Sequence, residues 1–491
     1  PGVTNSLTAL KNAQMAQAPL ILLGGAAPTV LKNRGALQDI DQLSLLKSIA
    51  KMAITITRNC DVVPVVEKAF DVCRSGVPGP VFIECPIDIL YNESLVRQWY
   101  GAKPDAERKS GMRSKLLDFY LQRHVDQMFA CEFEDMKPGG YKVVSPDFAS
   151  RSVSKALELV AMSQRPVLIV GSQATLQPDN IDKLAGAVGS LVIPTYLTGM
   201  ARGLLGRSHP MQMRHQRKKA LQKADLVIIA GMPCDFRLNY GRSIGSGARI
   251  IAVNRSKADL KLNCRPDLAV HSDPFQFLCS LADAFAPEPS AWEAWIQELK
   301  KNDDEREAFI TKISEEDTEF VNPLAMLKIM DKAIDDNGII IADGGDFVAT
   351  ASYILQPSGP LRWLDPGVFG TFGVGAGFAL GSKLVHPEAE VWLIYGDGAA
   401  GFSLQEFDTF VRHQLPVIAV VGNDGGWTQI ARDQITLFGD DVATQLRRTD
   451  YHAVAEGFGA KGFLLEKAED VDSVFQEAKQ AAKNGQPVLI N

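Results

Sequence analysis

The sequence lacks long apolar runs and any excess of basic residues. No uninterrupted apolar run reaches the ~18 residues that a membrane span needs, and no secretory signal peptide is recognisable. The formal net charge is -7 with both signs interspersed, which disfavours nucleic acid as a main partner because phosphate-binding faces are usually basic. A hydrophobic content of 46% and a charged content of 22% indicate an ordinary globular chain.

The seven cysteines contain no CxxC pair. This spacing argues against a structural zinc site, and a disulfide framework is not expected in a chain of 491 residues. We therefore expect most of the cysteines to be small apolar residues of the core.

Short apolar runs alternate with segments of helical periodicity along the chain. Strands are predicted at residues 18–23, 80–84, 165–171, 190–194, 224–231, 249–254, 338–342, 390–395 and 416–421, and helices at 61–74, 114–133, 181–188, 217–223 and 292–315. Such alternation predicts parallel sheets. The fold class is therefore α/β, with three doubly wound parallel-sheet domains, and at about 150 residues per domain the length agrees.

Composition suggests where the domains divide. We expect residues 1–96 to be the C-terminal half of one domain, 97–150 a linker with a helical insertion, 151–288 a central domain and 289–491 a third. The helix predicted at 114–133 either packs on its own domain or acts as a membrane-contacting or lid helix. Because the chain begins at Pro1 with residues typical of a domain interior, we expect the first domain to be incomplete here and further sequence to precede it.

Two successive predicted strands carry polar residues at their C-terminal ends. Residues 390–395 are followed by Gly396-Asp397-Gly398, and residues 416–421 by Asn423 and Asp424, which come 26 and 27 residues after Asp397. Parallel strands bring such ends to one rim of the sheet, where ligands bind. Hard oxygen ligands suit Mg²⁺. Ser403 and Glu406 form a capping-box pattern that predicts a helix start, whose N–H groups favour an anion.

This arrangement resembles the thiamine-diphosphate signature, in which GDG is followed by a 24-residue spacer and an Asn pair. The third domain is similar to the diphosphate-binding domain of the acetolactate synthase superfamily. Residues 1–5 (PGVTN) and 79–83 (GPVFI) with Pro86 resemble its pyrimidine-binding domain, and residues 151–288 resemble its third α/β module.

The resemblance implies a set of site residues. Cofactor binding is expected from Gly345, Asp346, Gly370, Gly373, Gly396, Asp397, Gly398, Ala399, Asn423, Asp424, Gly426 and Trp427. The metal ligands implied are Asp397, the Gly426 backbone and either Asp424, by ungapped position, or Asn423, by residue type. The catalytic Glu that activates the cofactor lies upstream of PGVTN in the family, so no residue of this chain is assigned to it.

A closer resemblance is to the animal acetolactate-synthase-like proteins, also named 2-hydroxyacyl-CoA lyase 2. Residues 12–17, 199–206, 234–242, 359–366 and 422–429 carry it. It implies thiamine-diphosphate- and Mg²⁺-dependent cleavage of a 2-hydroxy fatty acyl-CoA to formyl-CoA and a one-carbon-shorter aldehyde, in fatty acid α-oxidation. It also implies a homodimer or homotetramer at the endoplasmic reticulum membrane, held by an N-terminal anchor outside this sequence.

Several assignments stay open on sequence alone. Arg202, Arg237 and Arg242 either meet the CoA phosphates or form surface ion pairs. Trp427 and Gln429 either face the substrate or pack in the core. His413 is expected at a helix end as a dipole partner.

The alternative functions are acetolactate synthesis from pyruvate and a non-catalytic role. The segment Gly425-Gly426-Trp427 departs from the Gly-Met-Val usual in acetolactate synthase, which favours the lyase.

Overall fold

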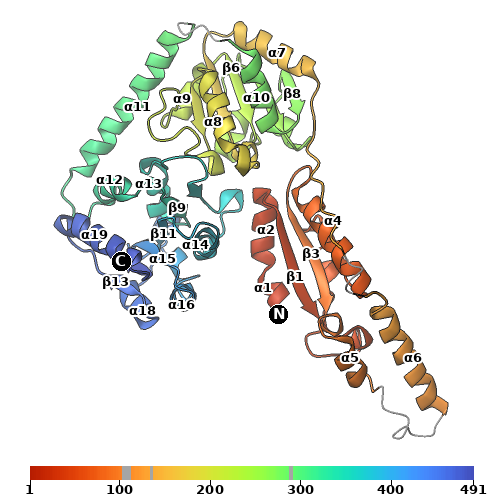
Figure 1. Cartoon of the computed structure of the whole chain (residues 1–491). Coiled ribbons are helices and arrows are strands. Elements are labelled where there is room, and N and C mark those ends of the chain that lie inside the picture. The colour runs from red at the N-terminus through yellow and green to blue at the C-terminus, as the bar shows by residue number, and fades with distance from the viewer. Residues whose placement is uncertain (102–111, 133–136, 287–290) are drawn as a thin grey trace. The chain divides into compact units, whose positions relative to one another are not determined.

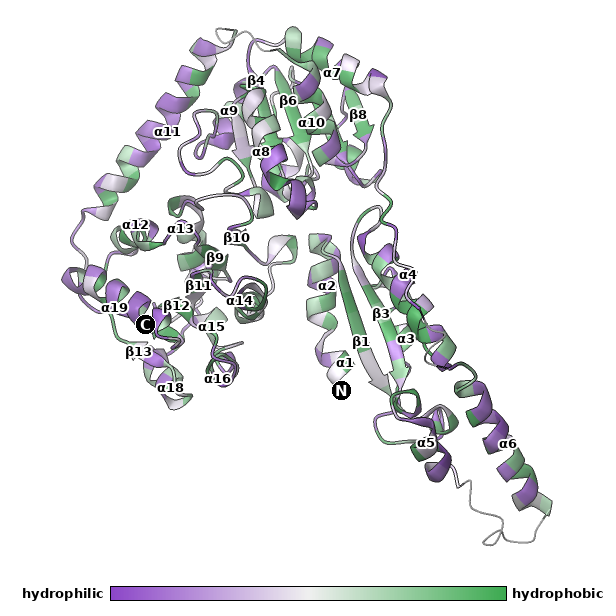
Figure 2. Ribbon diagram, viewed as in Figure 1, coloured by the Kyte–Doolittle hydropathy of each residue, from purple (hydrophilic) through white to green (hydrophobic). Residues whose placement is uncertain are grey.

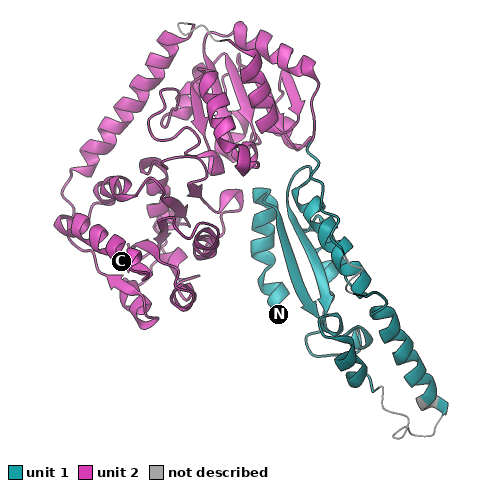
Figure 3. Ribbon diagram, in the orientation of Figure 1, with its two compact units in different colours: residues 1–145 teal, residues 146–491 magenta. Residues whose placement is uncertain are grey.

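The computed structural model describes residues 1–101, 112–132, 137–286 and 291–491. The chain divides into two compact units, Pro1–Ser145 and Pro146–Asn491 (Figure 3). Each unit contains parallel sheet, one sheet in the first unit and two in the second, so the predicted fold class is confirmed. The predicted boundaries at residues 96 and 288 stay predictions.

The first unit is built on a three-stranded sheet with the order β1-β3-β2. Strand β3 lies in the middle and is buried along almost its whole length, while β1 is hydrophobic over most of its length (Figure 2). The elements of the unit are α1 (Gly2–Asn5), α2 (Leu7–Ala16), β1 (Leu20–Ala26), α3 (Gln42–Leu46), β2 (Met52–Thr55), α4 (Val62–Arg74), β3 (Pro80–Pro86), α5 (Glu93–Trp99) and α6 (Met112–Met128).

The helix predicted at residues 114–133 is α6, but it ends at Met128, and residues 129–132 are not helical; residue 133 lies outside the described residues. The C-terminal half of α6 packs on its own unit: Val125 and Met128 are buried, and the His124 Nε2 lies 2.7 Å from the Thr29 hydroxyl. The N-terminal half exposes apolar side chains such as Phe119. Of the two alternatives for this helix, packing on its own domain is therefore confirmed for its C-terminal half.

The expectation that the cysteines are apolar core residues and not disulfide partners is wrong for Cys60 and Cys131. Cys60 and Cys131 form a disulfide across 71 residues, and the Asn59 side chain also bonds the Cys131 backbone in both directions. The pairing is invisible in the sequence because the two residues become neighbours only when the segment after α6 packs against the start of α4. Among the free cysteines, Cys73, Cys234 and Cys279 are buried, as expected.

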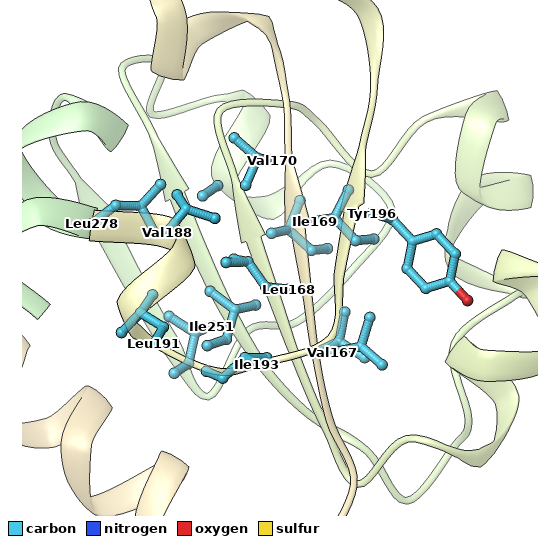
Figure 4. Close-up of a cluster of buried hydrophobic side chains, with 14 of the residues drawn as sticks. Val167, Leu168, Ile169, Val170, Val188, Leu191, Ile193, Tyr196, Ile251 and Leu278 are labelled. Carbon is cyan, nitrogen blue, oxygen red and sulfur yellow. The ribbon is translucent and has the colours of Figure 1, made fainter. Parts of the chain in front are cut away.

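The central part of the second unit is a five-stranded sheet with the order β5-β4-β6-β7-β8. Its core gathers side chains from both faces of β4 and from the flanking helices (Figure 4). The elements are α7 (Ser150–Ala161), β4 (Pro166–Val170), α8 (Ile181–Ser190), β5 (Thr195–Leu197), α9 (Arg217–Lys223), β6 (Leu226–Ala230), β7 (Arg249–Asn254), β8 (Leu268–His271) and α10 (Pro274–Ala284).

The strand predicted at residues 190–194 is wrong. Ser190 ends helix α8, and the strand begins at Thr195. Leu191 and Ile193 are buried in the connection between them, which turns at Val192 with a φ of 55°. A short apolar run has the same appearance in a buried connection and in a buried strand, so periodicity does not separate the two.

Helix α11 (Glu293–Ser314), the long helix in Figure 1, leads into the last part of the chain. This part is built on a six-stranded sheet with the order β10-β9-β11-β12-β14-β13. Two separate cores cover its faces: α12, α13 and α19 contribute to one, and α14, α15, α16 and α18 to the other. The elements are α12 (Pro323–Ala333), β9 (Ile339–Ala342), α13 (Asp346–Ile354), β10 (Trp363–Leu364), α14 (Val374–Val385), β11 (Val391–Gly396), α15 (Asp397–Ala400), α16 (Glu406–Arg412), β12 (Val417–Gly422), α17 (Thr428–Phe438), α18 (Tyr451–Gly457), β13 (Lys461–Phe463), α19 (Val471–Lys483) and β14 (Val488–Ile490).

The capping box predicted at Ser403 and Glu406 does not form. The helix after β11 starts at once, as α15, and α16 begins only at Glu406 with no side-chain cap. The Ser403 hydroxyl instead lies 3.2 Å from the Tyr395 hydroxyl in the interior. None of the helices in the described part of the chain has the length and apolarity needed to cross a bilayer.

Candidate cofactor site

The C-terminal ends of β11 and β12 lie side by side. The two strands pair in parallel, with Gly396 opposite Gly422, so Asp397 and the Asn423–Asp424 pair emerge at the same rim. The sequence interpretation required this proximity, and the structure brings these residues together.

The Asp397 carboxylate binds the backbone of both loops. It is 2% exposed; its Oδ1 accepts from Gly398 N at 2.7 Å, and its Oδ2 accepts from Gly425 N at 2.8 Å and Gly426 N at 3.1 Å. Burial raises the pKa of Asp397 and the charge of Asp424 raises it further, while the backbone N–H donors lower it. The carboxylate therefore ties the two strand ends together, with a second carboxylate close enough to repel it.

Asn423 and Asp424 have different surroundings. The Asn423 amide donates to the Thr449 carbonyl at 2.9 Å and to the Asn491 side chain at 3.0 Å, and its Oδ1 is buried without a hydrogen-bond partner. Asp424 is exposed, and it accepts a hydrogen bond from the Thr428 hydroxyl. Asp424 therefore offers an exposed carboxylate at the same rim, with a charge that acts on Asp397, whereas Asn423 is anchored towards the chain's last strand.

Glycines let the strand ends approach one another. Gly345 has a φ of 120°, and a Cβ there would lie 3.0 Å from the Gly396 Cα, so a side chain would press the β9 and β11 ends apart. A Cβ at Gly398 would meet the Trp427 ring at 2.6 Å. The Trp427 ring also packs on Phe372, with centroids 5.5 Å apart, and so covers the turn after β11.

The remaining predicted site residues divide between rim and core. Asp346 begins α13 and pairs with Arg432 of α17 at 2.7 Å. Gly370 and Gly373 both adopt a positive φ in the loop before α14. Ala399, in contrast, is 1% exposed and packs in the core, so its side chain does not face a ligand.

Sequence reasoning missed two residues that hold this rim. The Asp343 carboxylate accepts from Gly373 N at 2.9 Å and Gly375 N at 2.7 Å, which fixes the glycine-rich loop to the end of β9. The buried Tyr451 hydroxyl donates to the Asp397 carbonyl at 3.3 Å. The Asp at the end of the predicted strand 338–342 was a visible signal, whereas nothing in the sequence pointed to Tyr451.

Asp343 predicts a pH-dependent stability. Burial raises its pKa to about 6 from 3.8, so the folded protein binds this proton more tightly than the unfolded chain. Its contribution to stability therefore falls as pH rises from about 4 to about 6 and is constant above. Relative to wild type, we expect the Asp343→Asn variant to gain about 1 kcal/mol between pH 5 and pH 7, measured from thermal midpoints. A constant offset between the two proteins across this range would contradict the assignment, because any lost hydrogen bond is independent of pH.

A cationic pocket of about 350 Å³ lies in the second unit, between the central sheet and the C-terminal end of α13. None of the described residues that line it is acidic, and its cations are Arg202, Arg214, Arg217, Lys218 and Arg237. Of the three arginines that the sequence suggested, Arg202 and Arg237 line this pocket, and Arg242 is exposed outside it. Arg214, Arg217 and Lys218 were missed.

Two further sequence expectations concern the surface. His413 is the C-cap residue of α16, as expected for a dipole partner. Gln429 is exposed on α17, so it does not pack in the core, and Trp427 is half-buried. Among the described residues there is no cluster of three His, Cys, Asp or Glu side chains suited to a metal. The predicted Mg²⁺ site does not need one, because a backbone carbonyl is its third ligand.

Family models match all three parts of the chain. They are the thiamine pyrophosphate enzyme N-terminal TPP-binding domain at residues 1–45, the central domain at 153–281 and the C-terminal TPP-binding domain at 343–491. These matches define a thiamine pyrophosphate enzyme and support thiamine diphosphate as the cofactor.

Similar proteins show to which family of thiamine pyrophosphate enzymes the chain belongs. The chain is 46% identical to human 2-hydroxyacyl-CoA lyase 2 over 100% of its length and 78% of the relative, and 45% identical to the Caenorhabditis elegans protein of that name with the same coverage. It is 29% identical to an acetolactate synthase large subunit of Mycobacterium tuberculosis, over 100% of the chain and 82% of the relative. The chain therefore belongs to the 2-hydroxyacyl-CoA lyase 2 family, and the predicted resemblance is confirmed.

Proposed function

We propose that this protein is a thiamine-diphosphate- and Mg²⁺-dependent lyase that cleaves 2-hydroxy fatty acyl-CoA to formyl-CoA and an aldehyde one carbon shorter. The reaction belongs to fatty acid α-oxidation. One observation carries the proposal: the buried Asp397 carboxylate lies at a strand rim with Asp424 beside it and glycine backbone around it.

The residues at the rim fit a bound Mg²⁺. Asp397 and Asp424 repel one another, and a divalent cation between them offsets both that repulsion and the desolvation of Asp397. The Gly426 carbonyl is proposed as the third ligand, and the orphaned Asn423 Oδ1 is the alternative to Asp424. Water and the cofactor's phosphates would supply the remaining oxygen ligands that Mg²⁺ prefers.

Thiamine diphosphate, when bound, supplies the carbanion chemistry that breaks the C1–C2 bond. The chain's own residues position the cofactor and shield it. Gly345 and Gly396 let the ends of β9 and β11 pack together, and Gly398 leaves room for the Trp427 ring, so the part of the rim that would meet the diphosphate is built from backbone. Trp427 covers the turn and limits the access of water. The activating glutamate stays a prediction from the family resemblance.

The cationic pocket supports an acyl-CoA substrate. Arg217 and Lys218 supply positive charge there with no acidic residue lining the cavity, which suits the phosphates of a nucleotide carrier. The pocket lies at the C-terminal end of α13, and Asp346 begins the same helix at the cofactor rim. Nine residues of helix span roughly 13 Å, a separation that a carrier with a long flexible arm can bridge.

The assembly and location are proposed from the resemblance. Superfamily members bring the pyrimidine-binding and diphosphate-binding domains together from different chains, so we propose a homodimer or homotetramer. Phe372, Phe402 and Ile430 near the rim are 41%, 59% and 56% exposed, as expected for a surface that a second chain covers. The proposed location is the endoplasmic reticulum membrane.

The experiment offers 2-hydroxyacyl-CoA and pyruvate separately to full-length protein loaded with thiamine diphosphate and Mg²⁺. We expect formyl-CoA and the shortened aldehyde from the first and no acetolactate from the second. The mycobacterial relative at 29% identity makes acetolactate synthesis the second candidate, and acetolactate without formyl-CoA would replace the lyase. Absence of thiamine-diphosphate binding by calorimetry would indicate a non-catalytic homologue.

A further inference from the structure

Helix α13 is capped at its C-terminus by two arginines from the central domain. The last four carbonyls of a helix have no partner within the regular helix pattern. In α13, the Ala351 carbonyl accepts from Leu355 N, which leaves the carbonyls of residues 352, 353 and 354. Each of these three accepts from an arginine: Arg202 bonds Ser352 O, and Arg214 Nη2 bonds Tyr353 O at 2.8 Å and Ile354 O at 3.0 Å.

The first turn of α13 contacts the cofactor loops. Asp346 pairs with Arg432 of α17, the helix that follows the Asn423–Asp424 loop. Phe347 packs so closely on Gly422, at the end of β12, that a Cβ there would lie 2.3 Å from its ring. A shift of α13 therefore moves the groups that position the cofactor loop.

Both arginines are held in place by other groups. Arg214 Nη1 bonds the Glu307 carboxylate at 2.5 Å, and Asp303, one turn earlier on α11, accepts from the Arg214 backbone N–H at 2.7 Å. The Arg202 guanidinium lies over the Trp363 ring, 4.9 Å from its centroid. Their donors point at α13, whereas Lys218 makes no ion pair within the described residues.

We propose that Arg202 and Arg214, although they line the cationic pocket, are positioning residues for the cofactor site and act on it through α13. Arg217 and Lys218 then remain to bind the anionic substrate. The inference rests on the proposed thiamine-diphosphate site. The cations of the pocket then have two roles, positioning of α13 and binding of the substrate. The cofactor dissociation constant reports the first role, and KM for the acyl-CoA reports the second.

The test measures the thiamine-diphosphate dissociation constant of full-length protein by calorimetry with Mg²⁺, together with KM for the acyl-CoA. We expect Arg214→Met to weaken cofactor binding about tenfold, because two carbonyls at the end of α13 lose a charged donor. Arg214→Lys, which keeps one cationic donor, should recover part of that loss. Glu307→Gln keeps Arg214 but loosens it, so a smaller loss of about threefold is expected should Arg214→Met fold poorly.

The matched control is Lys218→Met, which removes a cation from the same pocket without touching α13. We expect it to raise KM for the acyl-CoA and leave the cofactor dissociation constant unchanged. If both Arg214→Met and Glu307→Gln bind the cofactor as tightly as wild type, this inference is overturned while the proposed function stands. Equal loss of cofactor affinity in Lys218→Met would also overturn it, because the effect would then be one of pocket charge. Failure of the wild type to bind thiamine diphosphate would overturn the proposed function and this inference together.

Discussion

Thiamine diphosphate is expected to bind the Asp397→Ala variant at least 100-fold more weakly than wild type, with no measurable lyase activity. Asp397 is a buried carboxylate that bonds the backbone after both strands, and it is proposed to bind the metal directly. Removing it deletes a charged ligand and releases the Gly425 and Gly426 N–H groups. Calorimetric titration with thiamine diphosphate and Mg²⁺ measures the loss.

The Asp397→Asn variant tests the charge of Asp397 separately from its size, because Asn has nearly the same size and no charge. The single amide oxygen can still accept from the Gly425 and Gly426 N–H groups, but an NH2 replaces the oxygen that accepts from Gly398, and the negative charge is gone. Since burial and Asp424 both disfavour that charge, we expect the cofactor-free Asn variant to melt higher than Asp397→Ala while binding Mg²⁺ more weakly than wild type. Asp408→Ala is the control, because this carboxylate is half-exposed on α16 and pairs only with surface groups. Binding within threefold of wild type in Asp397→Ala would refute the proposed metal site.

Asp424→Ala is expected to lower mainly the affinity for Mg²⁺, and Asn423→Ala mainly the stability of the fold. We expect Asp424→Ala to lower Mg²⁺ affinity by about 10- to 100-fold, since a carboxylate beside Asp397 is removed. Asn423→Ala should mainly lower the melting temperature, because Asn423 bonds Thr449 and the last residue, Asn491. Its effect on Mg²⁺ affinity should stay below about fivefold.

Asp424→Asn recreates the Asn pair usual in the superfamily. An amide oxygen also binds Mg²⁺, so we expect this variant to keep cofactor binding with a modest loss of affinity from the missing charge. Both affinities can be read from Mg²⁺ titrations at saturating thiamine diphosphate. If Asn423→Ala loses more metal affinity than Asp424→Ala, the ligand is Asn423 and its buried Oδ1 faces the ion.

The sequence predicted most of the second unit because its strands are continuous apolar runs. The runs that form β4, β6, β7, β11 and β12 were recognisable, since both faces are buried over most of each strand. Strands β8, β10, β13 and β14 of this unit were missed; each has two to four residues, too few for a periodic signal. The strand predicted at residues 190–194 and the capping box predicted at Ser403 were wrong because tertiary packing decided the role of these residues. Leu191 and Ile193 are buried in a connection, and the Ser403 hydroxyl lies next to the Tyr395 hydroxyl in the interior.

What the sequence determined by itself is the succession of parallel-sheet domains along the chain and the meeting of Asp397 with residues 423 and 424. This follows because parallel strands must end at one rim, whatever packs around them. Only the tertiary structure decided which partners surround these residues. Asn423 is drawn to Asn491, Asp343 to the glycine loop and Arg214 to α13 by contacts 30 to 139 residues apart. Such contacts depend on how helices and loops pack in space, and no local spacing encodes them.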